Sequence, residues 1–186
     1  MFQNMGGMGN ASDQPSQHKL DNLKKIMINK RIAIIGLAEV NSNWSKFPLK
    51  IIHILGRKSR SITTGDKRVT TYDVTFQIGG TSIMAIDEIS CREIETGKEF
   101  RNLGRWSWML LRGKNNVRTT IITAYCPTVS AGERGEYIQQ LEYLTIMKVQ
   151  NDQRPQFLIY LNTEISILIH QGEQITLMGD WKSESF

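Results

Sequence analysis

The sequence predicts an α+β fold in which two mostly antiparallel sheets are packed as a sandwich and flanked by helices. Three observations support this prediction. Apolar runs rich in β-branched residues alternate with segments of helical spacing, strand-like segments are separated by short turns, and two further helical segments follow them. With 186 residues, of which 40% are hydrophobic and 22% charged, the chain is expected to form a single domain over residues 1–186.

The first half of the chain is expected to place a helix between two strands. In order, the elements are a very short strand at Gln3-Asn4, a loop over 6–17, a helix over 20–28, a strand over 32–37 and a short helix within 44–55. Apolar side chains at helical intervals indicate the first helix, and Asp21 near its start favours the helix N-terminus. The apolar run over 32–37 is typical of a strand that is buried on both faces.

The second half is expected to contain four strands, two helices and a last strand. The four strands cover 69–76, 81–86, 105–111 and 118–125, the helices cover 133–150 and 157–171, and the last strand covers 174–178. Thr, Val, Ile, Tyr and Trp dominate the strands, whereas the helices carry apolar residues on one side. Because short connections cannot cross over to make parallel pairs, we expect the four strands to form an antiparallel meander.

The composition favours an anionic partner and an intracellular protein. The net charge is +5 and the pI is about 9.3, and a basic surface attracts phosphate groups by long-range Coulomb forces. The two cysteines, Cys91 and Cys126, have no paired spacing, so a reducing compartment is expected, cytoplasmic or nuclear. Neither a leader segment nor an apolar run of membrane-spanning length is present in the sequence.

Two carboxylates follow apolar strands. Glu39 comes directly after the strand over 32–37, and Asp180 comes after the last strand. Strands that end at one rim of a sheet would bring such groups together, and oxygen ligands of this kind suit Mg²⁺. A carboxylate just past a strand is more often simply solvated, so the pattern alone leaves both interpretations open.

Five segments, in order along the chain, resemble the endonuclease/exonuclease/phosphatase family, whose fold is DNase I-like. They are Gln3-Asn4, Ile-Gly-Leu-Ala-Glu-Val-Asn over 35–41, Gly79-Gly80-Thr81, Thr-Ala-Tyr-Cys-Pro over 123–127 and Met-Gly-Asp-Trp over 178–181. The runs 104–108 and 118–120 also resemble members encoded by retroelement-like reading frames. The resemblance implies a metal-dependent hydrolase of phosphodiester bonds.

The resemblance also implies roles for individual residues. Asn4 and Glu39 would hold a divalent metal, Mg²⁺ or Mn²⁺, and Tyr125 would contact the scissile phosphate. Asp180 would orient or deprotonate the attacking water. For Asn4 the alternative is a turn residue that bonds its own backbone, and for Tyr125 it is a ring that packs in the core.

The sequence departs from the family pattern in two ways that bear on activity. Lys182 stands where the family has an asparagine, and a flexible lysine does not reproduce the fixed donor of an amide. Lys182 and Arg105 are nevertheless candidates for binding phosphate. The family's terminal Ser-Asp-His segment would lie beyond Phe186, so we expect an incomplete domain that lacks its C-terminal strands and has an open sheet edge.

The expected function is therefore an endonuclease-like phosphodiesterase that acts on nucleic acid, DNA rather than RNA, with weak or no activity. Two alternatives are open at this point. One is a non-catalytic remnant of the family that only binds nucleic acid, and the other is a phosphatase of small phosphorylated molecules, since one scaffold serves several chemistries. The sequence gives no indication of the oligomeric state.

Overall fold

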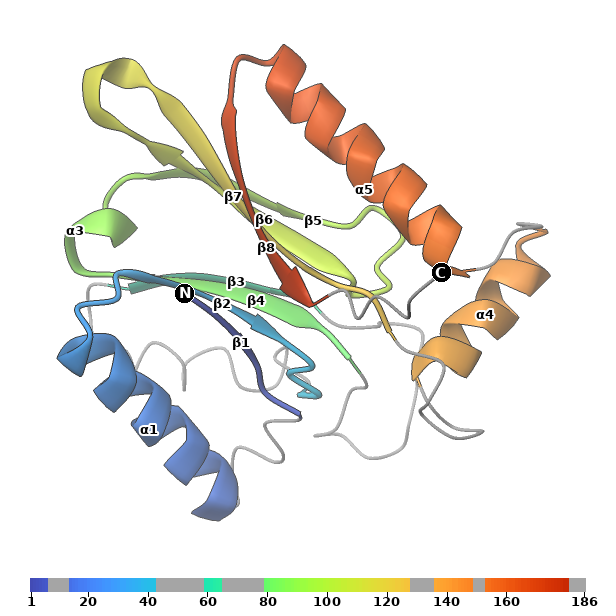
Figure 1. Cartoon of the computed structure of the whole chain (residues 1–186), viewed down its shortest axis with the longest axis horizontal. Coiled ribbons are helices and arrows are strands. Elements are labelled where there is room, and N and C mark those ends of the chain that lie inside the picture. Colours follow the sequence, from blue (N-terminus) through green and yellow to red (C-terminus); the bar gives the residue numbers. More distant parts are fainter. Residues whose placement is uncertain (7–13, 43–58, 65–78, 128–135, 149–152, 181–186) are drawn as a thin grey trace.

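Two four-stranded sheets, with helices on their outer faces, form the protein (Figure 1). The structure is a computed structural model, and it describes residues 1–6, 14–42, 59–64, 79–127, 136–148 and 153–180. The elements are β1 (Phe2–Asn4), α1 (Gln14–Asn29), β2 (Ile34–Ala38), β3 (Ser59–Thr64), β4 (Thr81–Ile86), α3 (Asp87–Ser90), β5 (Glu93–Lys98), β6 (Trp106–Arg112), the 3-10 helix η2 (Lys114–Asn116), β7 (Arg118–Tyr125), α4 (Glu136–Ile146), α5 (Gln153–His170) and β8 (Gln174–Asp180). The predicted α+β sandwich is confirmed.

The first sheet has the strand order β1-β2-β4-β3 and carries α1 on its outer face. β1 runs parallel to β2, and the other neighbours are antiparallel. Leu23 and Met27, which lie one helical turn apart on α1, pack with Ile35, Leu37 and Met84 of the sheet. The amphipathic helix and the strand predicted from the apolar run therefore cover each other.

The second sheet has the strand order β5-β6-β7-β8 and carries α5 on its outer face (Figure 1). β8 runs parallel to β7, whereas β5, β6 and β7 are antiparallel. Phe157 and Leu161 of α5 pack with Trp106 and Ile122 of the sheet. The chain between β7 and β8 contains α4 and α5, which is the long crossover that a parallel pair needs. None of the helices that the structure describes has the length and apolarity of a membrane span.

Between the sheets lies a third apolar layer. Ile83 and Ala85 of β4 meet Met109, Leu111 and Ile121 of the second sheet. Since side chains alternate along a strand, these residues point into the layer between the sheets and their neighbours along each strand point to the outer face.

Gly36 of β2 sets how closely the two sheets approach. A Cβ atom at this position would collide with Thr123 Oγ1 and would lie 2.9 Å from Met178 Cε, both in the second sheet. The absence of a side chain at residue 36 therefore lets β2 lie directly against β7 and β8.

The predicted meander is wrong in part. The strands predicted over 105–111 and 118–125 do form an antiparallel hairpin, but the strand over 81–86 belongs to the other sheet, where it pairs with β2 and β3. The connection through α3 carries the chain from one sheet to the other (Figure 1). The sequence pattern does not reveal β5, whose side chains are mostly charged or small because it is an edge strand with little burial.

Other differences from the predicted elements concern β3 and the start of α1. The short strand β3 was also missed, and α1 begins at Gln14, inside the expected loop over 6–17. Pro15 does not prevent this start, because the first turn of a helix has free N–H positions that a proline does not need. The helix expected within 44–55 and the strand expected over 69–76 lie outside the described residues.

We predict that Gly36→Ala destabilises the protein by about 1–3 kcal/mol, because the new methyl group overpacks the contact between the sheets. Urea unfolding measures the change. In a Thr123→Ala background, where the colliding hydroxyl is gone, the same substitution should cost clearly less. Equal costs in the two backgrounds would show that Gly36 does not set the spacing of the sheets.

Candidate functional site

Four strands end at one edge of the sandwich, and each ends at or next to a residue that the sequence analysis selected. Asn4 is the last residue of β1, Glu39 follows β2, Tyr125 ends β7 and Asp180 ends β8. β1 and β2 are parallel, as are β7 and β8, so within each pair the carboxyl ends coincide. Asn4 is the register partner of Ala38, and Tyr125 is that of Asp180.

A hydrogen bond between Asn4 and Asp180 joins the two pairs of strands. Asn4 Nδ2 donates to Asp180 Oδ2 at 2.8 Å, and Asn4 Oδ1 accepts from the backbone N–H of Gly6 at 2.9 Å. Met5 packs toward α1, so by alternation Asn4 faces the second sheet. Asp180, two residues after Met178, faces the first sheet in the same way. The structure thus brings together two side chains that are 176 positions apart in sequence.

Glu39 lies in a backbone turn that the following loop fixes. Its φ of 49° is in the left-handed region, which costs a residue with a side chain about 1–2 kcal/mol. The turn is held because Asn41 N–H donates to Gly79 O at 2.8 Å and Gly79 N–H donates back to Asn41 Oδ1 at 2.5 Å. Strained backbone that its surroundings hold in place is a common feature of functional sites.

The turn leaves Glu39 half-buried beside the end of β1. Ala38, the preceding residue, accepts a hydrogen bond from Met5 N–H at 2.9 Å. Within the part of the chain that the structure describes, the Glu39 carboxylate is in no ion pair. Glu39 therefore has a carboxylate that no neighbouring cation neutralises among these residues, at the strand end where Asn4 lies.

Tyr125 is more enclosed than the other three residues. Only 6% of it is exposed, and its position in the alternation of β7 places it on the face that looks toward the first sheet, as for Thr123 and Ile121. Its backbone N–H donates to Arg105 O at 2.7 Å, and the next residue's N–H donates to Asp180 O at 3.2 Å. The first bond ties the end of β7 to the start of β6, and the second ties it to the end of β8.

Beneath this edge the layer between the sheets becomes polar, which the sequence analysis did not find. Thr81 Oγ1 and Ser107 Oγ form a hydrogen bond of 3.2 Å from one sheet to the other. Thr123 is fully buried beside them, and its hydroxyl has no hydrogen-bond partner among the described residues. The signal in the sequence was a change from Ile and Met to Thr and Ser at the inward positions of these strands.

The donor atoms at this edge suit a hard divalent cation. Two carboxylates and one carboxamide offer only oxygen as ligands, which Mg²⁺ prefers, and Mg²⁺ usually keeps several waters instead of requiring a complete protein cage. The described residues include no cluster of three or more His, Cys, Asp and Glu side chains. Among the described residues, the site therefore offers two carboxylates, with Asn4 as a third candidate ligand.

The structure corrects the prediction for Arg105 as a phosphate ligand. Arg105 is fully buried and pairs with Glu99, which is itself 1% exposed. Glu99 Oε1 accepts from Arg105 Nε at 2.8 Å, and the rings of Trp106 and Phe157 lie beside the guanidinium. An arginine enclosed in this way has no route to a phosphate at the surface. Lys182, the other candidate, lies outside the described residues.

Sequence comparison finds no family model and no curated protein that match the chain. Comparison of structures does find similar proteins. The 3′ phosphatase NExo from Neisseria, solved with a product DNA hairpin, has a TM-score of 0.60 at 12% identity, and the alignment covers 96% of this chain and 55% of NExo. The APE2 catalytic domain of Xenopus laevis gives 0.60 at 12% identity, with 98% and 57% covered.

An endonuclease/exonuclease/phosphatase from Bacteroides vulgatus is similar as well, with a TM-score of 0.53 at 14% identity. That alignment covers 98% of this chain and 64% of the Bacteroides protein. The chain thus spans between about half and two thirds of the length of these three structures. At such low identity the likeness concerns the fold.

Proposed function

Because the chain has the DNase I-like fold of the endonuclease/exonuclease/phosphatase proteins, we propose that it is a metal-dependent phosphodiesterase that acts on DNA. The hydrogen bond between Asn4 and Asp180 carries this proposal. It joins the two sheets at the edge where Glu39 and Tyr125 also end their strands. Among the described residues, the Glu39 carboxylate at this edge is in no ion pair, which supports a role in binding a cation.

In the proposed site, Asn4 and Glu39 would hold Mg²⁺ or Mn²⁺. The bound metal would act as a Lewis acid on a phosphoryl oxygen and offset the negative charge that develops there. The observation in favour of these two residues is that Asn4 pairs in register with Ala38, the residue before Glu39, and that both side chains offer oxygen atoms.

Asp180 would position the attacking water and accept its proton. A general base must be held within hydrogen-bond distance of the proton it takes, so its orientation matters. The bond from Asn4 Nδ2 to Oδ2 fixes one oxygen of the Asp180 carboxylate, and the other oxygen would bind the attacking water. Tyr125, at the adjacent strand end, would donate its hydroxyl proton in a hydrogen bond to a phosphoryl oxygen.

Two observations favour DNA as the substrate. The chain has a net charge of +5, which favours a polyanion. NExo, one of the proteins with the same fold, was solved with a DNA hairpin as its product. We propose that the activity is weak, since Lys182 replaces an asparagine of the family pattern and a lysine lacks the fixed geometry of an amide donor.

We predict slow, Mg²⁺-dependent nicking of supercoiled plasmid DNA by the wild-type chain. Glu39→Gln and Asp180→Asn should each lower the rate at least about tenfold, because each removes a charged oxygen that the reaction needs. Glu88→Gln is the matched control, since Glu88 is an exposed residue of α3 at the opposite end of the sandwich.

Equal nicking by the wild type and both site variants would contradict the proposed catalytic site and point to a contaminating nuclease. Plasmid that stays intact with every variant, together with salt-dependent DNA binding, would instead favour the non-catalytic alternative.

Lys182→Asn tests the second part of the proposal. The substitution restores the amide of the family pattern, and a single donor of this kind is worth about 10²-fold or more in rate where it stabilises a transition state. We therefore expect faster nicking by Lys182→Asn in the same plasmid assay. An unchanged or lower rate would mean that Lys182 is not the cause of weak activity.

A further inference from the structure

The end of the sandwich opposite the candidate active site carries a row of three arginines. Arg92 precedes β5, Arg112 ends β6 and Arg118 begins β7. Arg112 N–H donates to Arg92 O at 2.8 Å, and Arg112 is the register partner of Arg118. The three residues therefore occupy neighbouring positions at the ends of three adjacent strands, which are spaced about 4.8 Å apart.

This row lies on the outer face of the second sheet, where α5 does not cover it. Trp108 donates a hydrogen bond to Glu164 of α5, so the even-numbered residues of β6 point toward the outer face. Arg112 lies four residues after Trp108 and therefore points to the same face. α5 ends at His170, and β8 then returns along β7 from the level of Thr119. The basic end of the sheet projects past the helix (Figure 1).

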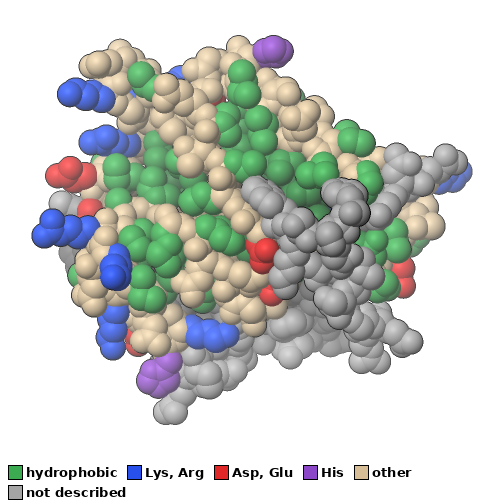
Figure 2. All heavy atoms as spheres, viewed as in Figure 1, with side chains coloured by type: hydrophobic (Ala, Val, Ile, Leu, Met, Phe, Trp, Pro, Cys, Tyr) green, Lys and Arg blue, Asp and Glu red, His purple; other side chains and the backbone are tan. Residues whose placement is uncertain are grey.

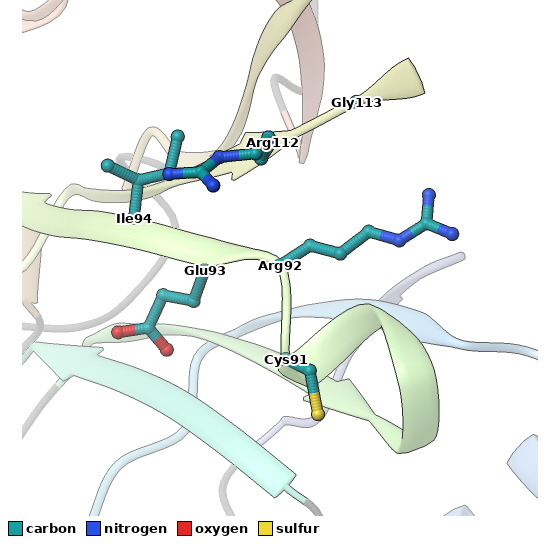
Figure 3. Close-up of a pocket in the computed structure, with 6 residues that line it drawn as sticks. All are labelled: Cys91, Arg92, Glu93, Ile94, Arg112 and Gly113. Atoms are coloured by element: carbon teal, nitrogen blue, oxygen red, sulfur yellow. The ribbon is translucent and has the colours of Figure 1, made fainter. Parts of the chain in front are cut away.

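Two of the three arginines have no acidic partner among the described residues. Arg118 Nη2 donates to Glu173 Oε1 at 2.8 Å, so its charge is balanced. Arg92 and Arg112 are exposed and form no ion pair with a described residue. Glu93, which follows Arg92, lies 3.8 Å from Arg60 of β3 and extends toward the other side of β5 (Figure 3).

A cavity of about 500 Å³ lies between these arginines. It is lined by Cys91, Arg92, Glu93, Ile94, Arg112 and Gly113. A β-bulge at Ile94 turns this apolar side chain outward, where it lies beside the Arg112 side chain (Figure 3). The Arg92 and Arg112 guanidinium groups lie on one side of β5 but extend in different directions, so they are spread out and do not converge on one point (Figure 3).

Lys114, exposed at the turn between β6 and β7, extends the basic surface beyond the arginines. From Arg112 to Arg118 the chain contains three basic residues and no acidic one. Lys and Arg side chains are visible along this edge of the molecule, over the end that carries α3 and the β6–β7 turn, with some acidic groups between them (Figure 2).

From this arrangement we propose that Arg92 and Arg112 bind the sugar–phosphate backbone of DNA at a contact separate from the candidate active site. The guanidinium groups diverge along a row that Lys114 extends. Such an arrangement suits a ligand with phosphates repeated along a chain better than it suits a single ion. Arginine suits this role because its planar group donates two parallel hydrogen bonds to a phosphate.

The contact is distant from the proposed chemistry. β6 runs its whole length between the two ends, and seven residues of strand span about 20 Å. DNA held here would therefore be a second segment, or a continuation of the substrate, and its binding would add to affinity without touching the reacting phosphate. The proposal does not depend on cleavage by the other end.

The test uses a short fluorescein-labelled DNA duplex and the full chain, with EDTA present so that no metal-dependent step contributes. Fluorescence anisotropy gives the affinity between about 50 and 200 mM salt. Arg92→Ala/Arg112→Ala should weaken binding about tenfold at the lowest salt. It should also flatten the slope of log affinity against log salt by about 2, since each lost phosphate contact removes about 0.9 from the slope.

Two matched variants make the result specific. Lys24→Ala/Lys25→Ala removes the same charge from α1, on the far side of the first sheet, and should leave the salt slope nearly unchanged. Arg92→Lys/Arg112→Lys keeps the charge and should keep most of the slope. Circular dichroism confirms that each variant is folded.

Equal effects of the arginine pair and the lysine pair would overturn the proposal, because they would show a response to net charge alone. An unchanged slope in Arg92→Ala/Arg112→Ala would overturn it as well. Failure of the catalytic proposal looks different, since Glu39→Gln would then nick plasmid like the wild type while the arginine variants still lose DNA affinity.

Discussion

The close approach of the two sheets at Gly36 is the constraint on which the candidate active site depends. Gly36 lies against Thr123 and Met178 and is the register partner of Phe2. Asn4 lies two residues after Phe2 on the same face of β1. Asp180 lies two residues after Met178 on the same face of β8. The packed contact thus lies about 7 Å below the hydrogen bond between these two residues. A bulkier residue at position 36 would separate the sheets and, with them, the two halves of the site.

The layer between the sheets changes in character along its length, and the change explains how a polar site can exist at its edge. Ile83 and Ile121 fill the middle, whereas Thr81, Ser107 and Thr123 follow toward the strand ends. Hydroxyl groups at this depth can form hydrogen bonds to side chains above them, which an apolar layer could not do. At the opposite end, among the described residues, Arg92 and Arg112 are exposed on the outer face, and Glu93 pairs with Arg60 of the other sheet.

Much of the fold could be predicted from local patterns, because α1, β2, β6, β7 and β8 each have a clear apolar period and turn residues at their ends. The edge strands β3 and β5 could not, since they bury little and therefore lack the pattern. The assignment of 81–86 to its sheet also depended on tertiary packing, because the α3 turn that changes sheets has no distinctive sequence.

The candidate site was likewise predictable in its individual residues but not in the contacts between them. Asn4, Glu39, Tyr125 and Asp180 were found because each lies at a strand end within a family-like segment. The motifs could not reveal that Asn41 would form hydrogen bonds with Gly79, or that Glu99 would form a buried ion pair with Arg105. Such pairs form only when the chain has folded.

A crystal structure of the protein soaked in Mn²⁺, with anomalous scattering used to locate the metal, would test the proposed metal site most directly. We predict one strong Mn²⁺ peak at the strand ends, within coordination distance of Glu39 and the Asn4 carboxamide and adjacent to Asp180. A peak bound by other residues, with Asn4 and Asp180 still joined and no metal beside Glu39, would contradict the proposed metal site.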